Sequence, residues 1–231
     1  MTHPPNEAKL FYELMWKLKY YVNQKHGFHK NISSLDEYAN LETKKKLKAR
    51  DEIWKTPELI EAYTQENPDA LPAEELEIIS KWKRFIKGSF HILRHLKKGS
   101  IFVGKDDQIY AVHGIQDPLD EVLPSYALPR MVEAILLPFK GKIIYDGLLA
   151  GYNIHFGGGI RSNLNHAYAV AKQKNRIITT LEPELAPSTI IKPGKSITPQ
   201  LKELSDILAK LKGNNTLQNS ALALVPAPAL I

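Results

Sequence analysis

Residues 131–156 hold three apolar, strand-like runs separated by short turns, and this stretch constrains the fold more than any other. The turns fall at Lys140-Gly141 and Asp146-Gly147. An Asp-Gly pair between apolar runs is a strong hairpin signal because both central residues of the tight turn need positive φ. Residues 101–115 contain two more strand-like runs around a turn. We therefore expect a meander of about five short antiparallel strands, which can curl into a small barrel.

The first 99 residues show helical periodicity instead. Ser34 and Glu37 are spaced as a capping box, and Gly27 is suited to end the helix before it. A long helix is predicted from Pro72 to Lys98, with Gly99 as its cap. The chain is thus predicted to be α+β: a helical N-terminal part, followed by a small antiparallel β-meander or barrel-like sheet with a covering helix.

Four regions are expected along the chain. They are a helical region at 1–99, a sheet plus helix at 100–182, a connector and C-terminal helix at 183–212, and a flexible apolar tail at 213–231. Leucines and an isoleucine between Leu201 and Leu211 form an apolar face that is expected to dock on a partner protein or a second copy. No apolar run reaches the roughly 18 residues that a membrane span needs, and the first residues lack the pattern of a signal peptide. We expect a cytoplasmic protein without a membrane partner.

The chain of 231 residues has a formal net charge of +6 and no cysteine. The missing cysteine excludes disulfides, thiol nucleophiles and Cys-ligated zinc, but does not identify the compartment. His91 and His95 are four residues apart, yet the surrounding residues are cations that would repel a metal. Neither a metal nor a cofactor is predicted.

Seven basic residues and no acidic residue lie between Lys81 and Lys98. On the predicted helix, Arg84, Lys87, Arg94 and Lys98 would share a face about 20 Å long, which can contact several phosphates. These four residues are the predicted nucleic-acid-binding site. The alternative is an ordinary solvated face.

A glycine run precedes the predicted covering helix. Glycines let the backbone approach a ligand closely, and the free amides of a helix start favour an anion. The predicted anion site consists of Gly157, Gly158, Gly159, Arg161 and Ser162. The spacing is neither of the common nucleotide-binding motifs. The alternative is a tight connection that needs glycine only for positive φ.

His155 and His166, with Asp146, would serve as an acid–base set if the fold gathers them, and Arg161 would then hold an anionic substrate. An Asp in a turn and a His on a strand also have ordinary structural explanations, so catalytic residues are not assigned.

Residues 137–147, with Asn153-Ile154 and Phe156-Gly157, resemble a block in an uncharacterised family of bacterial proteins. The resemblance covers about a quarter of the chain and implies a coherent folded unit, but no activity. The favoured function is therefore a non-enzymatic module that binds nucleic acid or another polyanion. The alternatives are an enzyme acting on a phosphorylated or nucleic-acid substrate at residues 157–163, and an interaction module that docks through its C-terminal helix.

Overall fold

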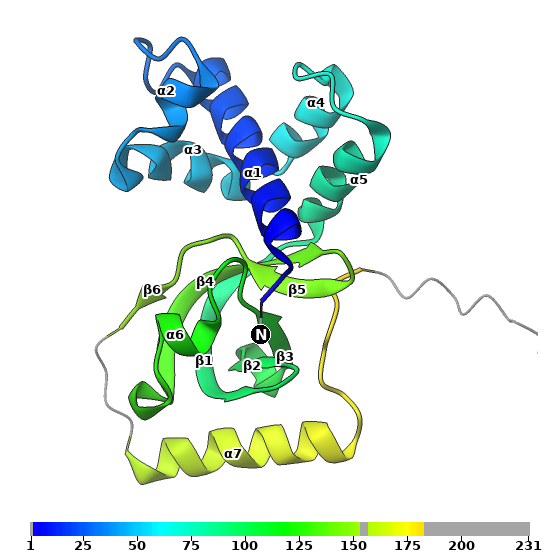
Figure 1. The fold of residues 1–231 in the computed structure, drawn as a ribbon. Helices are drawn as coiled ribbons and strands as arrows, with labels where there is room; N and C mark the ends of the chain where they lie inside the picture. The colour runs from blue at the N-terminus through cyan, green and yellow to red at the C-terminus, as the bar shows by residue number, and fades with distance from the viewer. Residues whose placement is uncertain (1, 153–156, 183–231) are drawn as a thin grey trace, which may run out of the picture. The chain divides into compact units, whose positions relative to one another are not determined.

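The computed structural model describes residues 2–152 and 157–182 (Figure 1). It confirms an α+β protein, with helices first and a sheet after them. The helices are α1 (Pro5–His26), α2 (Leu35–Ala39), α3 (Thr43–Lys55), α4 (Glu58–Glu66), α5 (Ala73–Lys81), α6 (Leu119–Val122) and α7 (Gly158–Gln173), with 3-10 turns η1 (Trp82–Arg84), η2 (Lys105–Asp107) and η3 (Ser125–Ala127). His155, the connector, the helix expected at Leu201–Leu211 and the tail at 213–231 lie outside the described residues.

Helix α1 is the centre of the helical part. Its apolar face is fully buried at Phe11, Leu14, Leu18 and Val22, and other helices pack around it. Gly27 ends the helix with a φ of 64°, as predicted. The hydroxyl of Ser34 accepts a hydrogen bond from the Glu37 amide at 3.2 Å, which confirms the cap of α2. Within the part of the chain that the structure describes, we find no helix with the length and apolar character needed to cross a bilayer.

The described strands form one mixed sheet. They are β1 (Ile86–Leu96), β2 (Gly99–Val103), β3 (Ile109–His113), β4 (Arg130–Phe139), β5 (Lys142–Tyr145) and β6 (Ala150–Gly151). The strand order is β1-β2-β3-β5-β4-β6, and an additional pairing between β1 and β4 closes the first five strands into a ring. The long strand β1 makes this closure because its first half pairs with β4 and its second half with β2.

The predicted meander is correct in its barrel-like form but wrong in being wholly antiparallel. Strands β3 and β5 pair in parallel, and the chain between β3 and β4 contains α6. A five-stranded ring with this connectivity resembles the OB-type barrel. The barrel interior contains Phe90, Phe102, Tyr110 and Val112, which belong to the main hydrophobic core.

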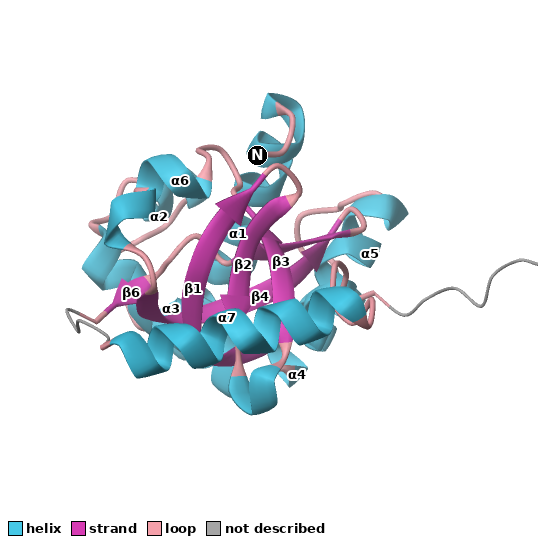
Figure 2. Ribbon diagram, turned by 90° about the horizontal axis from the view of Figure 1, so that it is seen from below, coloured by secondary structure: helices cyan, strands magenta, loops and turns pink. Residues whose placement is uncertain are grey.

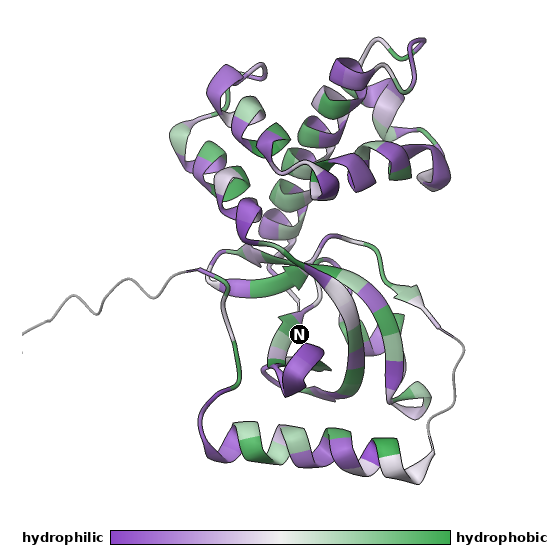
Figure 3. Cartoon of the chain, turned by 180° about the vertical axis from the view of Figure 1, so that it is seen from behind, coloured by the Kyte–Doolittle hydropathy of each residue, from purple (hydrophilic) through white to green (hydrophobic). Residues whose placement is uncertain are grey.

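The predicted covering helix is present as α7, which starts at Gly158, inside the glycine run. It crosses the outer side of β1, β2 and β3 (Figure 2). Polar and apolar residues alternate along α7 (Figure 3), and one face of the helix is buried against the sheet, while Ile160 near its start is exposed. The contact joins Leu164, Ala167, Tyr168 and Ala171 of α7 to Leu93, Ile101, Val103 and Ile109 of the strands.

The long helix predicted from Pro72 to Lys98 is wrong. Helix α5 ends at Lys81, and residues 86–96 form a strand, so the helical region ends near residue 84 rather than 99. Apolar residues or glycine occupy every second position from Ile86 to Ile92, which is strand periodicity, and Gly88 disfavours a helix by about 1 kcal/mol. A β-bulge between Ile92 and Arg94 then interrupts the alternation, and this irregularity allowed a helical period to fit the whole segment.

Gly99 starts β2 instead of capping a helix. Its φ is 120°, and a Cβ at this position would lie 3.1 Å from the Val112 carbonyl oxygen. Glycine is therefore required here by backbone conformation and by the close approach of β3.

The two predicted turns differ. Lys140 and Gly141 both have positive φ, and they form the tight hairpin between β4 and β5. At the second turn only Gly147 has positive φ, at 93°. Strands β5 and β6 each pair with β4 and not with each other, so Asp146-Gly147 is not a hairpin turn. The buried Asp146 carboxylate has a structural role there instead.

Candidate anion and nucleic-acid interface

The predicted basic helix face does not exist, because its residues lie along η1, β1 and the β1–β2 turn. Arg94 follows Lys87 by seven positions, an odd number, so in a regular strand the two side chains would point to opposite sides. The bulge between Ile92 and Arg94 restores Arg94 to the outer side: Lys87 is opposite Ile135, and Arg94 is opposite Ile101, which packs on α7. At about 3.3 Å per residue, Lys87 and Arg94 are roughly 20 Å apart.

The four residues predicted to contact nucleic acid therefore lie in different places on the structure. Arg84 is exposed at the end of η1, and Lys98 is exposed in the turn. Lys87 lines a cavity of about 220 Å³ together with Arg50 and Glu133. Arg94 lines another cavity, where it meets a residue of the predicted anion site.

Arg94 and Arg161 line one open cavity of about 270 Å³ between β1, the η3–β4 segment and α7. Its other lining residues are Leu93, His95, Ser125, Leu128, Pro129 and Asn165. No acidic side chain is among these described lining residues. We refer to this cavity and its rim as the Arg94–Arg161 surface.

Hydrogen bonds position both arginines. The Arg94 Nη2 donates to Oδ1 of Asn165, and its guanidinium lies 4.9 Å from the centre of the Tyr168 ring. The Asn165 Nδ2 donates to the Arg161 carbonyl oxygen at 2.8 Å. The Arg161 Nη2 donates to the Leu128 carbonyl oxygen at 3.2 Å. A guanidinium has five N–H donors, so each arginine keeps donors for an anion.

His95 of β1 fixes the chain segment that leads into η3, next to the Arg94–Arg161 surface. Its Nε2 lies 2.8 Å from the Leu123 carbonyl oxygen, and its Nδ1 lies 2.7 Å from the Ser100 hydroxyl. A carbonyl only accepts, so Nε2 carries the proton and donates. Both ring nitrogens are thereby engaged, and His95 anchors the segment that leads into η3 rather than serving as a free ligand.

Tyr126 is the feature of this surface that the sequence reasoning missed. It lies in η3 beside two lining residues, Ser125 and Leu128, and its side chain is 90% exposed. An exposed aromatic ring beside arginines is typical of surfaces on which bases stack. The local signal was weak, a tyrosine in a loop between Pro124 and Pro129.

The glycine run does not form the tight turn with positive φ that was the alternative to an anion site. Gly157 precedes α7 with a φ of −67°, and Gly158 and Gly159 are already helical. No side chain caps this helix start, so Ser162 is not a cap. Arg161 bonds the Leu128 carbonyl and lies beside Arg94, while the anion site at Gly157–Gly159 stays a prediction.

Gly158→Ala should therefore raise the free energy of unfolding by about 0.4–1 kcal/mol, because alanine restricts the unfolded chain and the native conformation suits it. A Cβ at Gly158 would meet nothing within 4 Å. Gly147→Ala is the contrasting variant, and it should destabilise because the φ of Gly147 is 93°. Urea unfolding of both variants tests this, and destabilisation by Gly158→Ala would contradict the helical assignment.

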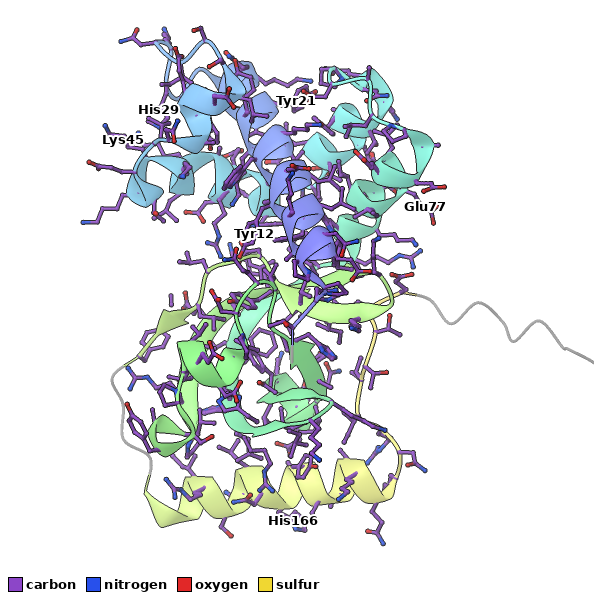
Figure 4. The ribbon with its side chains drawn as sticks, viewed as in Figure 1. Tyr12, Tyr21, His29, Lys45, Glu77 and His166 are labelled. Carbon is purple, nitrogen blue, oxygen red and sulfur yellow. The ribbon has the colours of Figure 1, made fainter. Side chains whose placement is uncertain are left out.

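The acid–base set of the enzyme hypothesis is not gathered. Asp146, Arg161 and His166 line three different cavities, and His155 lies outside the described residues. His166 is on the exposed side of α7 (Figure 4), beside a cavity of about 490 Å³ that Asp106 and Arg176 also line.

Asp146 instead joins the helical part to the barrel. Its Oδ2 accepts from Arg50 Nε at 2.5 Å and from Trp54 Nε1 at 3.1 Å, and its Oδ1 accepts from Arg50 Nη2 at 3.1 Å. The carboxylate side chain is fully buried. Asp146 and Arg50 thus form a bidentate, charge-assisted pair. Asp146, which the sequence placed in a turn, is buried because it makes this pair between the helices and the barrel.

Comparison of the chain with family models, curated proteins and solved structures gave no match. The resemblance of residues 137–157 to a bacterial family therefore stays a prediction.

Proposed function

We propose that this protein is a non-enzymatic module that binds single-stranded nucleic acid at the Arg94–Arg161 surface. The observation that carries the proposal is a pair of positioned arginines in a cavity without acidic lining residues, with the exposed Tyr126 directly after the lining residue Ser125. In this proposal Arg94 and Arg161 contact phosphates, and Tyr126 stacks on a base.

The arginines support contact with the phosphates, and the exposed tyrosine supports contact with the bases. Arginine matches phosphate in charge and in the geometry of its donors. Stacking on an aromatic side chain requires an unpaired base, which favours a single strand over a duplex. The neighbouring Lys97 and Lys98 are exposed in the β1–β2 turn and add positive charge near the end of β1.

The barrel fold adds an analogy with proteins that bind oligonucleotides. OB-type barrels bind oligonucleotides on the face of strands 2 and 3. Here α7 covers that face, and the strand residues beneath it are aliphatic. The proposal therefore rests on residues at the edge of the covered face, where Arg161 of α7 lies close to β1.

The test is binding of a short fluorescent single-stranded oligonucleotide, followed by fluorescence anisotropy at several salt concentrations. Arg94→Gln/Arg161→Gln should weaken binding and reduce the salt slope by about 1.4, because each phosphate contact on a single strand contributes about 0.7. Tyr126→Ala should weaken binding by about 1–3 kcal/mol and leave the slope unchanged, because stacking releases no counterion.

Lys44→Gln/Lys48→Gln is the matched control, since it removes the same charge from exposed positions on α3. It should change affinity less than the arginine pair does. Equal affinities and slopes for the two double variants would reject the proposed surface. A cytoplasmic location, and docking of a partner through Leu201–Leu211, are further parts of the proposal that need separate tests.

A further inference from the structure

A second cavity, of about 160 Å³, lies where α1 and α3 meet the segment after β5. Its lining carries the cations Lys19, Lys46 and Arg50, and among the described lining residues Asp146 is the one acid. Aromatic walls come from Tyr12 and Trp16 of α1. Figure 4 shows Tyr12 at the end of the helical part that faces the barrel.

The acidic groups near this cavity are already engaged. Both Asp146 oxygens accept hydrogen bonds from Arg50, and the Arg50 Nη1 also contacts Asp51 at 3.0 Å. The Lys46 Nζ donates to the Ala39 carbonyl at 2.8 Å and keeps two further donors. Across the described residues, no carboxylate lies within ion-pair distance of Lys19.

Lys19 is therefore a partly buried cation without a paired anion. Burial lowers its pKa to about 8; Asp146 opposes this effect, while Arg50 and Lys46 add to it. Lysine is rarely buried unless it is paired, because removing an ammonium group from water is costly. An anion in the cavity would offset that cost.

We propose that this cavity binds a small organic monoanion, with its carboxylate between Lys19 and Lys46 and its flat apolar body against Tyr12 and Trp16. Three cations and the two carboxylates of Asp146 and Asp51 leave one positive charge, which matches a singly charged ligand. The volume of about 160 Å³ is below the roughly 300–1,000 Å³ of sites for drug-sized ligands, so the ligand is small. Trp16 is 36% exposed, which leaves its ring accessible to the ligand.

The probe is benzoate, and benzamide is its uncharged counterpart. Benzoate should raise the melting temperature of the parent in a saturable manner, as a ligand of the folded state does. Benzamide should not. Lys19→Met should lose at least tenfold in benzoate affinity, while Lys44→Met, which removes a charge from an exposed position on α3, should bind as the parent does.

A second measurement needs no variant. The Nζ chemical shift of Lys19, followed by nuclear magnetic resonance, should show its pKa rising from about 8 when benzoate is added, because a bound carboxylate stabilises the ammonium form. An unchanged Lys19 titration at saturating benzoate would overturn the proposal. Equal benzoate binding by Lys19→Met and Lys44→Met, or equal binding of benzamide and benzoate, would also overturn it.

Discussion

Asp146→Asn should lower the free energy of unfolding by about 3–5 kcal/mol, the usual result of breaking a buried ion pair from one side. The carboxylate is 3% exposed and accepts hydrogen bonds from the Arg50 guanidinium and the Trp54 indole. An amide removes the negative charge and offers one oxygen where two are used, so Arg50 loses its buried counter-charge and keeps only the exposed Asp51. Urea unfolding measured by circular dichroism gives the difference.

Asp51→Asn is the matched control, since Asp51 also contacts Arg50 but its side chain is 63% exposed. Surface pairs contribute about 0–1 kcal/mol, so this variant should stay within that range of the parent. Arg50→Met combined with Asp146→Leu should recover much of the loss, because both charges of the buried pair are then removed and Asp51 is 63% exposed to water. If Asp146→Asn unfolds as the parent does, the pair does not stabilise the junction of helices and barrel.

Stability should also fall as the pH drops from about 6.5 to about 4, through His113. The side chain is 8% exposed, and its Nδ1 is buried without a hydrogen-bond partner among the described residues. Burial lowers the pKa of His113 to about 4, and Lys142 and His3 add to the effect. Between pH 6.5 and pH 4, His113 is protonated in the unfolded chain and stays neutral in the folded chain, so acid favours unfolding. The free energy of unfolding should be about 3 kcal/mol lower at pH 4 than at neutral pH because of His113. Above pH 6.5 the contribution of His113 to stability is constant.

The control for this prediction separates His113 from the general effect of acid. His113→Phe keeps a planar ring and removes the titrating group, so its stability should depend less on pH across that window. His166→Phe, at an exposed position on α7, should follow the parent. Unfolding free energies from urea titrations across the pH range provide the measurement. If the unfolding free energies of His113→Phe and the parent differ by the same amount at every pH, His113 does not cause the loss of stability in acid.

Features fixed by neighbouring residues were predictable from sequence. The cap at Gly27, the hydroxyl cap at Ser34 and the hairpin at Lys140-Gly141 each depend on a few adjacent positions. The barrel-like sheet and the covering helix followed from hydrophobic periodicity. Strand β1 was missed because its bulge breaks the alternation, and because its stability comes from pairing with both β2 and β4.

The candidate site was predictable in its residue types and not in its assembly. Arg94 and Arg161 were assigned to separate sites, and they share one cavity because α7 crosses the outer side of β1. Tyr126 and Lys19 occur in unremarkable local sequence, and their importance depends on exposure and burial that only the fold determines. The parallel pairing of β3 with β5 likewise has no local signal.

The central claim is that a single strand lies on the Arg94–Arg161 surface with a base on Tyr126. Photocrosslinking of a bound oligonucleotide that carries 5-iodouridine, followed by mass spectrometry of the linked peptide, tests it most directly. The account predicts a crosslink at Tyr126 that disappears in Arg94→Gln/Arg161→Gln. Crosslinks confined to the helices α1 to α5, or a Tyr126 crosslink that the double variant leaves unchanged, would contradict it.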